Sequence, residues 1–310
     1  MLALPAKGFA RSINHHNVDL SICCDWIEAC ALFSGGEATG SDIVDILREN
    51  EIYATQDFAW ALVNNVFAMI RERARVLGLG YPIRVRDGTR VVAEGEWDVY
   101  AAYAFCLTLS LSRAYPEWWR AFGVDYGPQG RHFEDLTAES VGAAFSGWSV
   151  HQTGWSAATP NGIAGIVTEL ADLLGEVAGN VTRWSAKKAK EAGLDLLCFR
   201  PFADGRSGVP VMLFQCASGA DWKSKLHTPE IRVWTKIIDF AAEPKKAFAM
   251  PFALGAGELR YHTNIVNGLL MDRDRLLSPG QANRDWASPA LTQHLRDWVE
   301  PRLATLPSAV

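Results

Sequence analysis

The sequence predicts an α+β protein in which a mostly helical N-terminal domain, residues 1–152, is followed by an α/β domain, residues 153–310, built on a central mixed sheet. In the first half, apolar residues recur at helical spacing over long stretches. In the second half, two short apolar runs flank a glycine-containing turn, which is the pattern of a buried β-hairpin. The length of 310 residues favours two domains, and a hydrophobic content of 49% is sufficient for two cores.

The N-terminal domain is expected to consist of helices and one hairpin. Several apolar stripes end at glycine, and Asp87-Gly88 separates two short alternating runs, which is typical of a tight hairpin turn. The expected helices span residues 20–33, 41–49, 57–77 and 97–114, with one more from residue 116 and another over 133–148. None of these segments contains a motif that indicates a particular chemistry.

The C-terminal domain is expected to begin after a polar run at residues 151–156. Thr159-Pro160 indicates an N-cap followed by proline in the first turn of a helix. The expected elements are a helix over 161–178, strands over 194–199 and 209–214, a helix over 230–242, a strand over 247–252, a short strand near 268–271 and a helix over 291–299.

Composition indicates a soluble cytoplasmic protein. No apolar run approaches the length needed to cross a bilayer, and the first residues lack the features of a signal peptide. The six cysteines form no CxxC pair, so buried thiols in a reducing compartment are expected. The net charge is −5, but residues 180–280 carry 15 Lys and Arg against 10 Asp and Glu, which is compatible with one face that meets phosphates.

The hairpin is the segment in which chemistry is expected. Buried strands rarely carry acids, yet Asp195 begins the first strand. In the simplest register, Asp195 and Gln215 lie at the same end of adjacent strands, and the segment that follows supplies Lys223 and Lys225. An acid, an amide and a nearby lysine therefore converge at one edge of the predicted sheet.

This arrangement resembles the catalytic core of the PD-(D/E)XK nuclease superfamily, the fold of many restriction enzymes. In that superfamily an acid on one strand and an acid or Gln on the next hold Mg²⁺, and a Lys two residues later stands beside the attacking water. Asp195 matches the first position and Gln215 the second, whereas Ala217 stands where the lysine would be. The run Gln-Cys-Ala-x-Gly-x-x-Trp-x-x-Lys, from Gln215 to Lys225, is similar to a variant in bacterial defence proteins. The lysine has therefore either migrated or been lost.

The resemblance implies a restriction-endonuclease-like core, a Mg²⁺- or Mn²⁺-dependent endonuclease acting on DNA, and a role in defence against phage with a partner protein. It implies metal ligands at Asp195, Gln215 and the backbone carbonyl of Cys216, because Mg²⁺ prefers oxygen ligands. Glu169 occupies the place of a glutamate on the helix before the sheet, although a solvent-exposed glutamate is an equal alternative. No membrane partner is expected, and a homo-oligomer is compatible with the sequence.

The lysine position and the phosphate contacts remain open at this point. Lys225 matches the Trp-x-x-Lys pattern and is the expected catalytic lysine, with Lys223 as the alternative. Lys223, Arg273 and Arg275 are candidate nucleic-acid contacts, and the two arginines are equally expected to pair with neighbouring aspartates.

Two other functions are compatible with the sequence. A nuclease fold that has lost catalysis would serve as a nucleic-acid-binding or scaffolding subunit, and Gln215 and Ala217 partly favour it. A cysteine hydrolase using Cys216, with His151 as partner, is suggested by the order of residues around the cysteine. However, the cysteine is displaced by one residue from the protease signature, which turns its side chain to the other face of the strand.

Overall fold

The computed structural model describes residues 1–10, 18–123, 125–153, 162–184, 193–279 and 286–309 of a mixed α/β protein. The chain forms two compact units. Unit 1 comprises residues 1–126, 251–253 and 273–310, and unit 2 comprises residues 127–250 and 254–272. The chain therefore passes between the units several times, where the sequence predicts a single boundary after residue 152.

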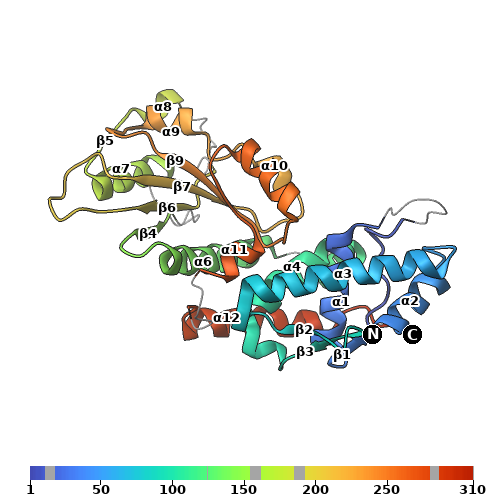
Figure 1. Ribbon diagram of the computed structural model, residues 1–310. Coiled ribbons are helices and arrows are strands. Elements are labelled where there is room, and N and C mark those ends of the chain that lie inside the picture. The colour runs from blue at the N-terminus through green and yellow to red at the C-terminus, as the bar shows by residue number, and fades with distance from the viewer. Residues whose placement is uncertain (11–17, 124, 154–161, 185–192, 280–285, 310) are drawn as a thin grey trace. The chain divides into compact units, whose positions relative to one another are not determined.

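Unit 1 is mainly helical and contains a three-stranded antiparallel sheet of order β1-β3-β2 (Figure 1). Its helices are α1 (Leu20–Phe33), α2 (Gly40–Glu49), α3 (Gln56–Leu77), α4 (Ala101–Ala114), α5 (Pro116–Phe122), α11 (Arg273–Leu277) and α12 (Pro289–Leu303). Its strands are β1 (Glu37–Thr39), β2 (Ile83–Arg86) and β3 (Arg90–Ala93), and its 3-10 helices are η1 (Gly78–Gly80) and η2 (Trp97–Tyr100). The predicted hairpin around residue 87 is confirmed, as are the helices expected between residues 20 and 122, with the 3-10 turn η2 taking the first four residues of one of them.

Unit 1 contains a cluster of buried charged side chains. The Arg273 side chain is completely buried, and its two terminal nitrogens donate to the carboxylate of Asp25 at 2.9 and 3.0 Å. Arg73 lies 2.8 Å from both Asp25 and Glu28. Burial alone would raise the pKa of Asp25, but the two arginines outweigh it, so the pKa is lowered and the carboxylate stays ionised. The opposite charges compensate one another, which is the condition for burying them.

The burial of Arg273 corrects one expectation. A side chain with no exposed surface cannot contact phosphates, so Arg273 is not a nucleic-acid contact in this structure. Its partner is neither Asp272 nor Asp274 but Asp25, which is 248 residues away in the chain. Arg275 lies exposed on α11.

Unit 2 is built on a five-stranded mixed sheet of order β10-β9-β7-β6-β4. Strand β6 is antiparallel to both of its neighbours, β4 and β7. Strands β7, β9 and β10 run parallel to one another. The strands are β4 (Ser149–Gln152), β6 (Leu196–Phe199), β7 (Val211–Cys216), β9 (Lys245–Ala249) and β10 (Leu269–Met271), with a separate pair β5 (Val177–Ala178) and β8 (Ile238–Asp239). The helices are α6 (Tyr126–Ala144), α7 (Gly162–Leu174), α8 (Val181–Trp184), α9 (Ile231–Ile237) and α10 (Ala256–Val266), and η3 (Trp222–Lys225) is a 3-10 helix.

The two faces of the central sheet are covered by different helices (Figure 1). Alternate residues of β6 and β7, Leu197, Phe199, Val211 and Leu213, pack with the buried faces of α7, α8 and α9 in one hydrophobic core. Helix α6 covers the opposite face, where its Thr137 hydrogen-bonds the thiol of Cys216. The central strands are thus buried on both sides, which explains their continuous apolar runs.

Four elements of unit 2 differ from the sequence-based expectations. Strand β4 replaces the polar linker expected from residue 151, and α6 starts at residue 126 rather than 133. Helix α10 is not predicted by the sequence, because only His262 and Val266 are buried along it and they form no broad apolar stripe. Helix α9 ends at Ile237 because the next two residues pair with β5.

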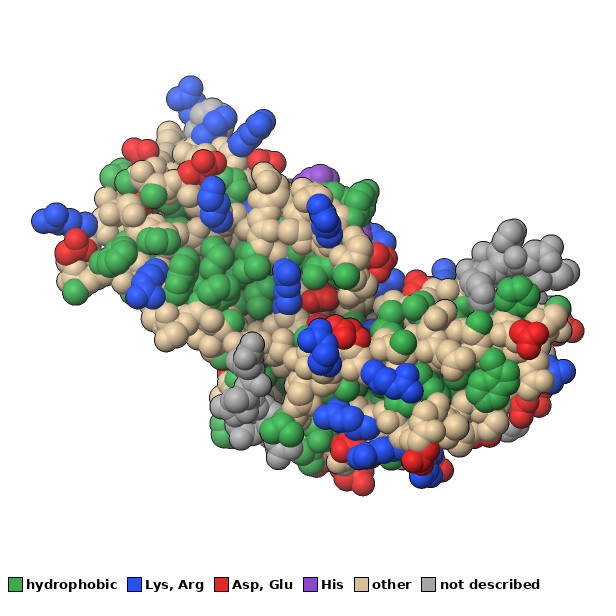
Figure 2. Space-filling view, viewed as in Figure 1, with side chains coloured by type: hydrophobic (Ala, Val, Ile, Leu, Met, Phe, Trp, Pro, Cys, Tyr) green, Lys and Arg blue, Asp and Glu red, His purple; other side chains and the backbone are tan. Residues whose placement is uncertain are grey.

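The surface of unit 2 carries dispersed charges on the face shown in Figure 2, where Lys and Arg side chains lie apart, with hydrophobic and uncharged side chains between them. Among the helices described, none combines the length and the apolar character that a membrane crossing requires.

Substituting Arg273 with Ala is expected to destabilise the protein by about 3–5 kcal/mol, because it leaves Asp25 buried without its bidentate partner. Urea unfolding followed by circular dichroism measures this loss. Arg275→Ala, two residues later and exposed, is the matched control and is expected to change stability by less than about 1 kcal/mol. Equal effects of the two substitutions would contradict the assignment of Arg273 to a buried ion pair.

Candidate active site

Asp195 and Gln215 lie side by side where β6 begins and β7 ends. The register pairs Leu196 with Phe214, so the preceding Asp195 lies across from Gln215, as the hairpin pattern predicts. The Nε2 atom of Gln215 donates to Oδ2 of Asp195 at 2.5 Å, and the backbone N–H of Cys216 donates to the same oxygen at 2.5 Å. Both side chains belong to residues that are 7% exposed. The acid is therefore buried and hydrogen-bonded to the neighbouring strand.

The other end of the Gln215 amide is held by two residues outside the strands. Its Oε1 atom lies 2.8 Å from the hydroxyl of Thr228, which also lies 2.7 Å from the carbonyl oxygen of Lys225 and can donate to one of them at a time. Gly193 adopts φ +72°, and a Cβ atom there would lie 3.0 Å from the same amide oxygen. The amide is thus enclosed, with its nitrogen toward Asp195 and its oxygen toward Thr228.

Two oxygen atoms converge beside this amide. Oδ2 of Asp195 lies 2.5 Å and the carbonyl oxygen of Cys216 lies 3.3 Å from Nε2 of Gln215. No three His, Cys, Asp or Glu side chains come together as a metal site in the described ranges, so a cage of the kind that zinc requires is not found there. Mg²⁺ usually takes one or two carboxylates and leaves its other positions to water and substrate phosphates. Asp195 and the Cys216 carbonyl therefore offer two oxygen ligands of the kind that Mg²⁺ or Mn²⁺ takes, whereas the Gln215 amide turns its nitrogen toward them and its oxygen toward Thr228.

The structure does not bring Glu169 to this group. Glu169 lies on α7 with its side chain 58% exposed, and its Oε1 atom is 3.3 Å from Nε2 of His151 on β4. Its participation in a metal site with Asp195 stays a prediction, and the contact that the structure shows for it is with His151. The cause is β4, which precedes α7 in the chain, so the helix that comes before the sheet is α6 rather than α7.

Helix α6 places a different glutamate near the strand ends. Burial, together with the charges of Asp195 and Glu134, raises the pKa of the Cys216 thiol well above its ordinary value, and the hydrogen bond from Thr137 only partly offsets this. Glu134 therefore lies close enough to Cys216 for electrostatic interaction.

A thiol with a raised pKa remains protonated at neutral pH, and His151 pairs with Glu169 instead, so the geometry disfavours a cysteine hydrolase.

The lysine segment is anchored next to the site by Trp222. This side chain is 1% exposed and packs against Phe248 and His262, with ring centroids 6.4 and 4.9 Å away. The Nζ atom of Lys223 lies 5.5 Å from the centre of the Trp222 ring, over its outer side. Lys225 is half-buried, and its Nζ atom makes no hydrogen bond or ion pair with the residues described. Of the two lysines, Lys225 is the one whose backbone is tied to Gln215, through Thr228.

Sequence reasoning misses two residues that hold the site and a third that lies near the Cys216 thiol. Thr228 holds the amide of Gln215, and Thr153 donates its backbone N–H and its hydroxyl to carbonyls at the start of β6. The third is Glu134, for which the sequence pattern indicates only a place near the start of a helix. The missing signal is β4, since recognising this strand would place Thr153 beside Asp195 and α6 directly before the sheet.

Comparison with known proteins gives no match. No protein-family model fits the chain, and no curated protein or solved structure is significantly similar to it.

Replacing Gly193 with Ala is expected to disturb the Gln215 amide, because the added Cβ would lie 2.7 Å from Cβ of Thr228. Gly205→Ala is the matched control, since Gly205 also has a positive φ, +62°, but an added Cβ there would have no atom within 4 Å. Backbone strain should cost about 1–2 kcal/mol in both variants, and steric overlap should cost about 1–3 kcal/mol more at Gly193. Urea unfolding compares them, and equal losses would contradict the enclosed position of the amide.

Proposed function

We propose that the chain is a metal-dependent deoxyribonuclease whose unit 2 is a restriction-endonuclease-like core. The observation that carries the proposal is the buried contact between Asp195 and Gln215 on adjacent strands, 2.5 Å between Oδ2 and Nε2. An acid on one strand and a glutamine on the next is the arrangement implied by the resemblance to the PD-(D/E)XK superfamily. Asp195 also accepts hydrogen bonds from the last two residues of β7, so its burial serves the pairing of the strands as well as the proposed chemistry.

Asp195 and the carbonyl of Cys216 would hold Mg²⁺ or Mn²⁺, and Gln215 would join them once its amide has turned its oxygen from Thr228 toward Asp195. The ion would supply Lewis-acid stabilisation of the charge on the scissile phosphate. Asp195 is hydrogen-bonded and buried, so its position is set before substrate arrives, whereas the Gln215 amide would have to rotate to present its oxygen.

Lys225 is the proposed catalytic lysine. An ammonium group is compact and can both orient the attacking water and stabilise negative charge that develops on the phosphate. The half-buried position of Lys225, its connection to Gln215 through Thr228 and the absence of any ion pair with the described residues leave its ammonium available for substrate. Lys223 is exposed and lies against Trp222, which favours contact with the DNA backbone instead.

The first test is cleavage of plasmid, linear and single-stranded DNA, and of RNA, with Mg²⁺ or Mn²⁺ and with EDTA. Asp195→Asn and Lys225→Ala are each expected to lower the cleavage rate by about 10²-fold or more while DNA binding is retained. Lys245→Ala is the matched control, because Lys245 is exposed at the opposite end of the parallel pair β7 and β9. Unchanged cleavage by Lys225→Ala, with loss in Lys223→Ala, would move the catalytic role to Lys223.

A second test replaces Gln215 with Glu and measures thermal stability. Without metal, the new carboxylate would lie against Asp195, so repulsion should lower stability at neutral pH by about 1–3 kcal/mol. Added Mg²⁺ should restore the melting temperature of this variant and change that of the unmodified protein less. Lowering the pH should also restore it, because one of two neighbouring carboxyls takes up a proton. If Mg²⁺ does not raise the melting temperature of the variant, the result would argue against a cation at this position.

A nuclease fold without catalysis is the second candidate, and the neutral Gln215 together with Ala217 favours it. Binding of DNA without cleavage under any metal condition would support this candidate. The setting in defence against phage, with a partner protein, rests on the resemblance of residues 215–225 alone.

A further inference from the structure

Unit 1 contains a pocket of about 640 Å³ between the start of α4 and the start of α12. This volume lies within the range of about 300–1,000 Å³ that is usual for small-molecule sites. The pocket is lined by both apolar and polar side chains, and Arg296 is the one charged side chain among the described residues that line it. A site with one cation and no carboxylate in its lining selects for an anion.

Arg296 is oriented but not neutralised. Its Nε atom donates to the backbone carbonyl of Asp98 at 2.8 Å, which fixes the plane of the guanidinium. No carboxylate pairs with it anywhere in the described residues, in contrast to Arg73 and Arg273 of the same unit. The two terminal nitrogens are therefore available as a fork for a phosphate or carboxylate group.

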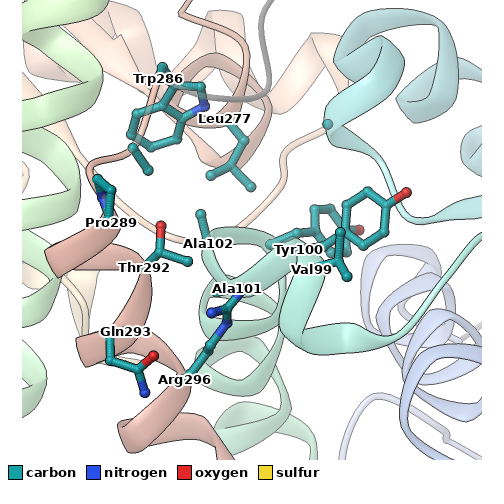
Figure 3. A pocket seen from close by; sticks show the side chains of 13 residues that line it. Val99, Tyr100, Ala101, Ala102, Leu277, Trp286, Pro289, Thr292, Gln293 and Arg296 are labelled. Carbon is teal, nitrogen blue, oxygen red and sulfur yellow. The ribbon is translucent and has the colours of Figure 1, made fainter.

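The remaining walls provide contacts for a planar ring (Figure 3). Trp286 and Leu277 lie on the side of the pocket opposite Arg296, and Tyr100 lies beside Val99 on a third side. Aromatic side chains stack on planar rings largely irrespective of the identity of the ring. The ring contacts and the guanidinium therefore face the same space from different sides.

Polar groups lie along α12 between these two parts. Thr292 and Gln293 line the pocket on the same helix as Arg296, one turn before it. The Nε2 atom of Gln293 is used in a hydrogen bond to Asp297, which leaves its amide oxygen as an acceptor. A ligand with hydroxyl groups between its ring and its anion would find partners here.

We propose that this pocket binds a nucleoside monophosphate. The phosphate would pair with Arg296, the base would pack against Trp286, and the sugar hydroxyls would meet Thr292 and Gln293. A single guanidinium matches one phosphate, whereas a triphosphate would bring charges for which the described lining has no cation. The site belongs to unit 1 and is independent of the residues assigned to cleavage.

Isothermal titration calorimetry of the whole 310-residue chain tests the proposal with AMP, GMP, CMP and UMP as probes, and with the four corresponding nucleosides, ATP and inorganic phosphate as comparisons. At least one monophosphate is expected to bind with a dissociation constant below about 1 mM. Its nucleoside, ATP and inorganic phosphate should each bind about tenfold more weakly or not at all.

Arg296→Gln is expected to weaken binding about tenfold or more, through loss of the bidentate contact. Arg120→Gln is the matched control, because Arg120 is an exposed arginine of unit 1 that does not line the pocket. Ala102→Leu fills the pocket without altering Arg296, so it should abolish binding while leaving the melting temperature within a few degrees of the unmodified protein. This second variant separates loss of the site from loss of the fold.

Three results would overturn the proposal. One is the absence of heat with all four monophosphates at about 1 mM and above. Another is binding that survives both Arg296→Gln and Ala102→Leu, which would place the ligand elsewhere. The third is equal affinity for nucleoside and monophosphate, which would remove the role of the guanidinium.

Discussion

The burial of one carboxylate constrains the place in unit 2 where β6 begins and β7 ends. Asp195 is taken out of water, and its Oδ2 atom accepts from the Gln215 amide and from the Cys216 N–H, the last two residues of β7. If a buried carboxylate loses such donors, the folded state loses stability on the order of several kcal/mol, or the carboxylate takes up a proton. The end of β7 is thereby held against the start of β6, and Gly193 and Thr228 enclose the same amide from outside the strands.

Much of the fold follows from local periodicity. Helices α1 and α3 and strands β6 and β7 are predictable because their own apolar residues repeat at the spacing of the element. Strand β4 is not predictable, because its four residues are polar or half-buried and its stability comes from pairing with β6. The division into two compact units is not predictable either, since contacts between distant segments, and not periodicity, decide which residues form each unit.

In the candidate site, too, contacts within one hairpin are predictable from the sequence, whereas contacts between distant segments are not. Asp195 and Gln215 are joined by a short hairpin, so their register follows from the turn that connects their strands. The contact of Glu169 with His151 is not predictable, because it depends on the unrecognised strand β4. The role expected for Arg273 is wrong because its partner, Asp25, is 248 residues away, and no local pattern distinguishes an arginine that meets phosphate from one that fills a buried ion pair.

On the second strand, the proposed superfamily has either an acid or a glutamine, and in this chain the position is occupied by Gln215. An amide can donate to Asp195 while it accepts from Thr228, which an ionised carboxylate cannot do. Two carboxylates about 3 Å apart would repel each other by about 5 kcal/mol at an effective dielectric constant of about 20. The amide therefore keeps the strand ends together in the absence of a cation, but it also contributes one negative charge less to holding one. In the proposed nuclease, the pair would bind its ion more weakly by itself and would rely on substrate phosphates for the remaining oxygen ligands, so we expect ion and DNA to bind cooperatively at Asp195 and Gln215.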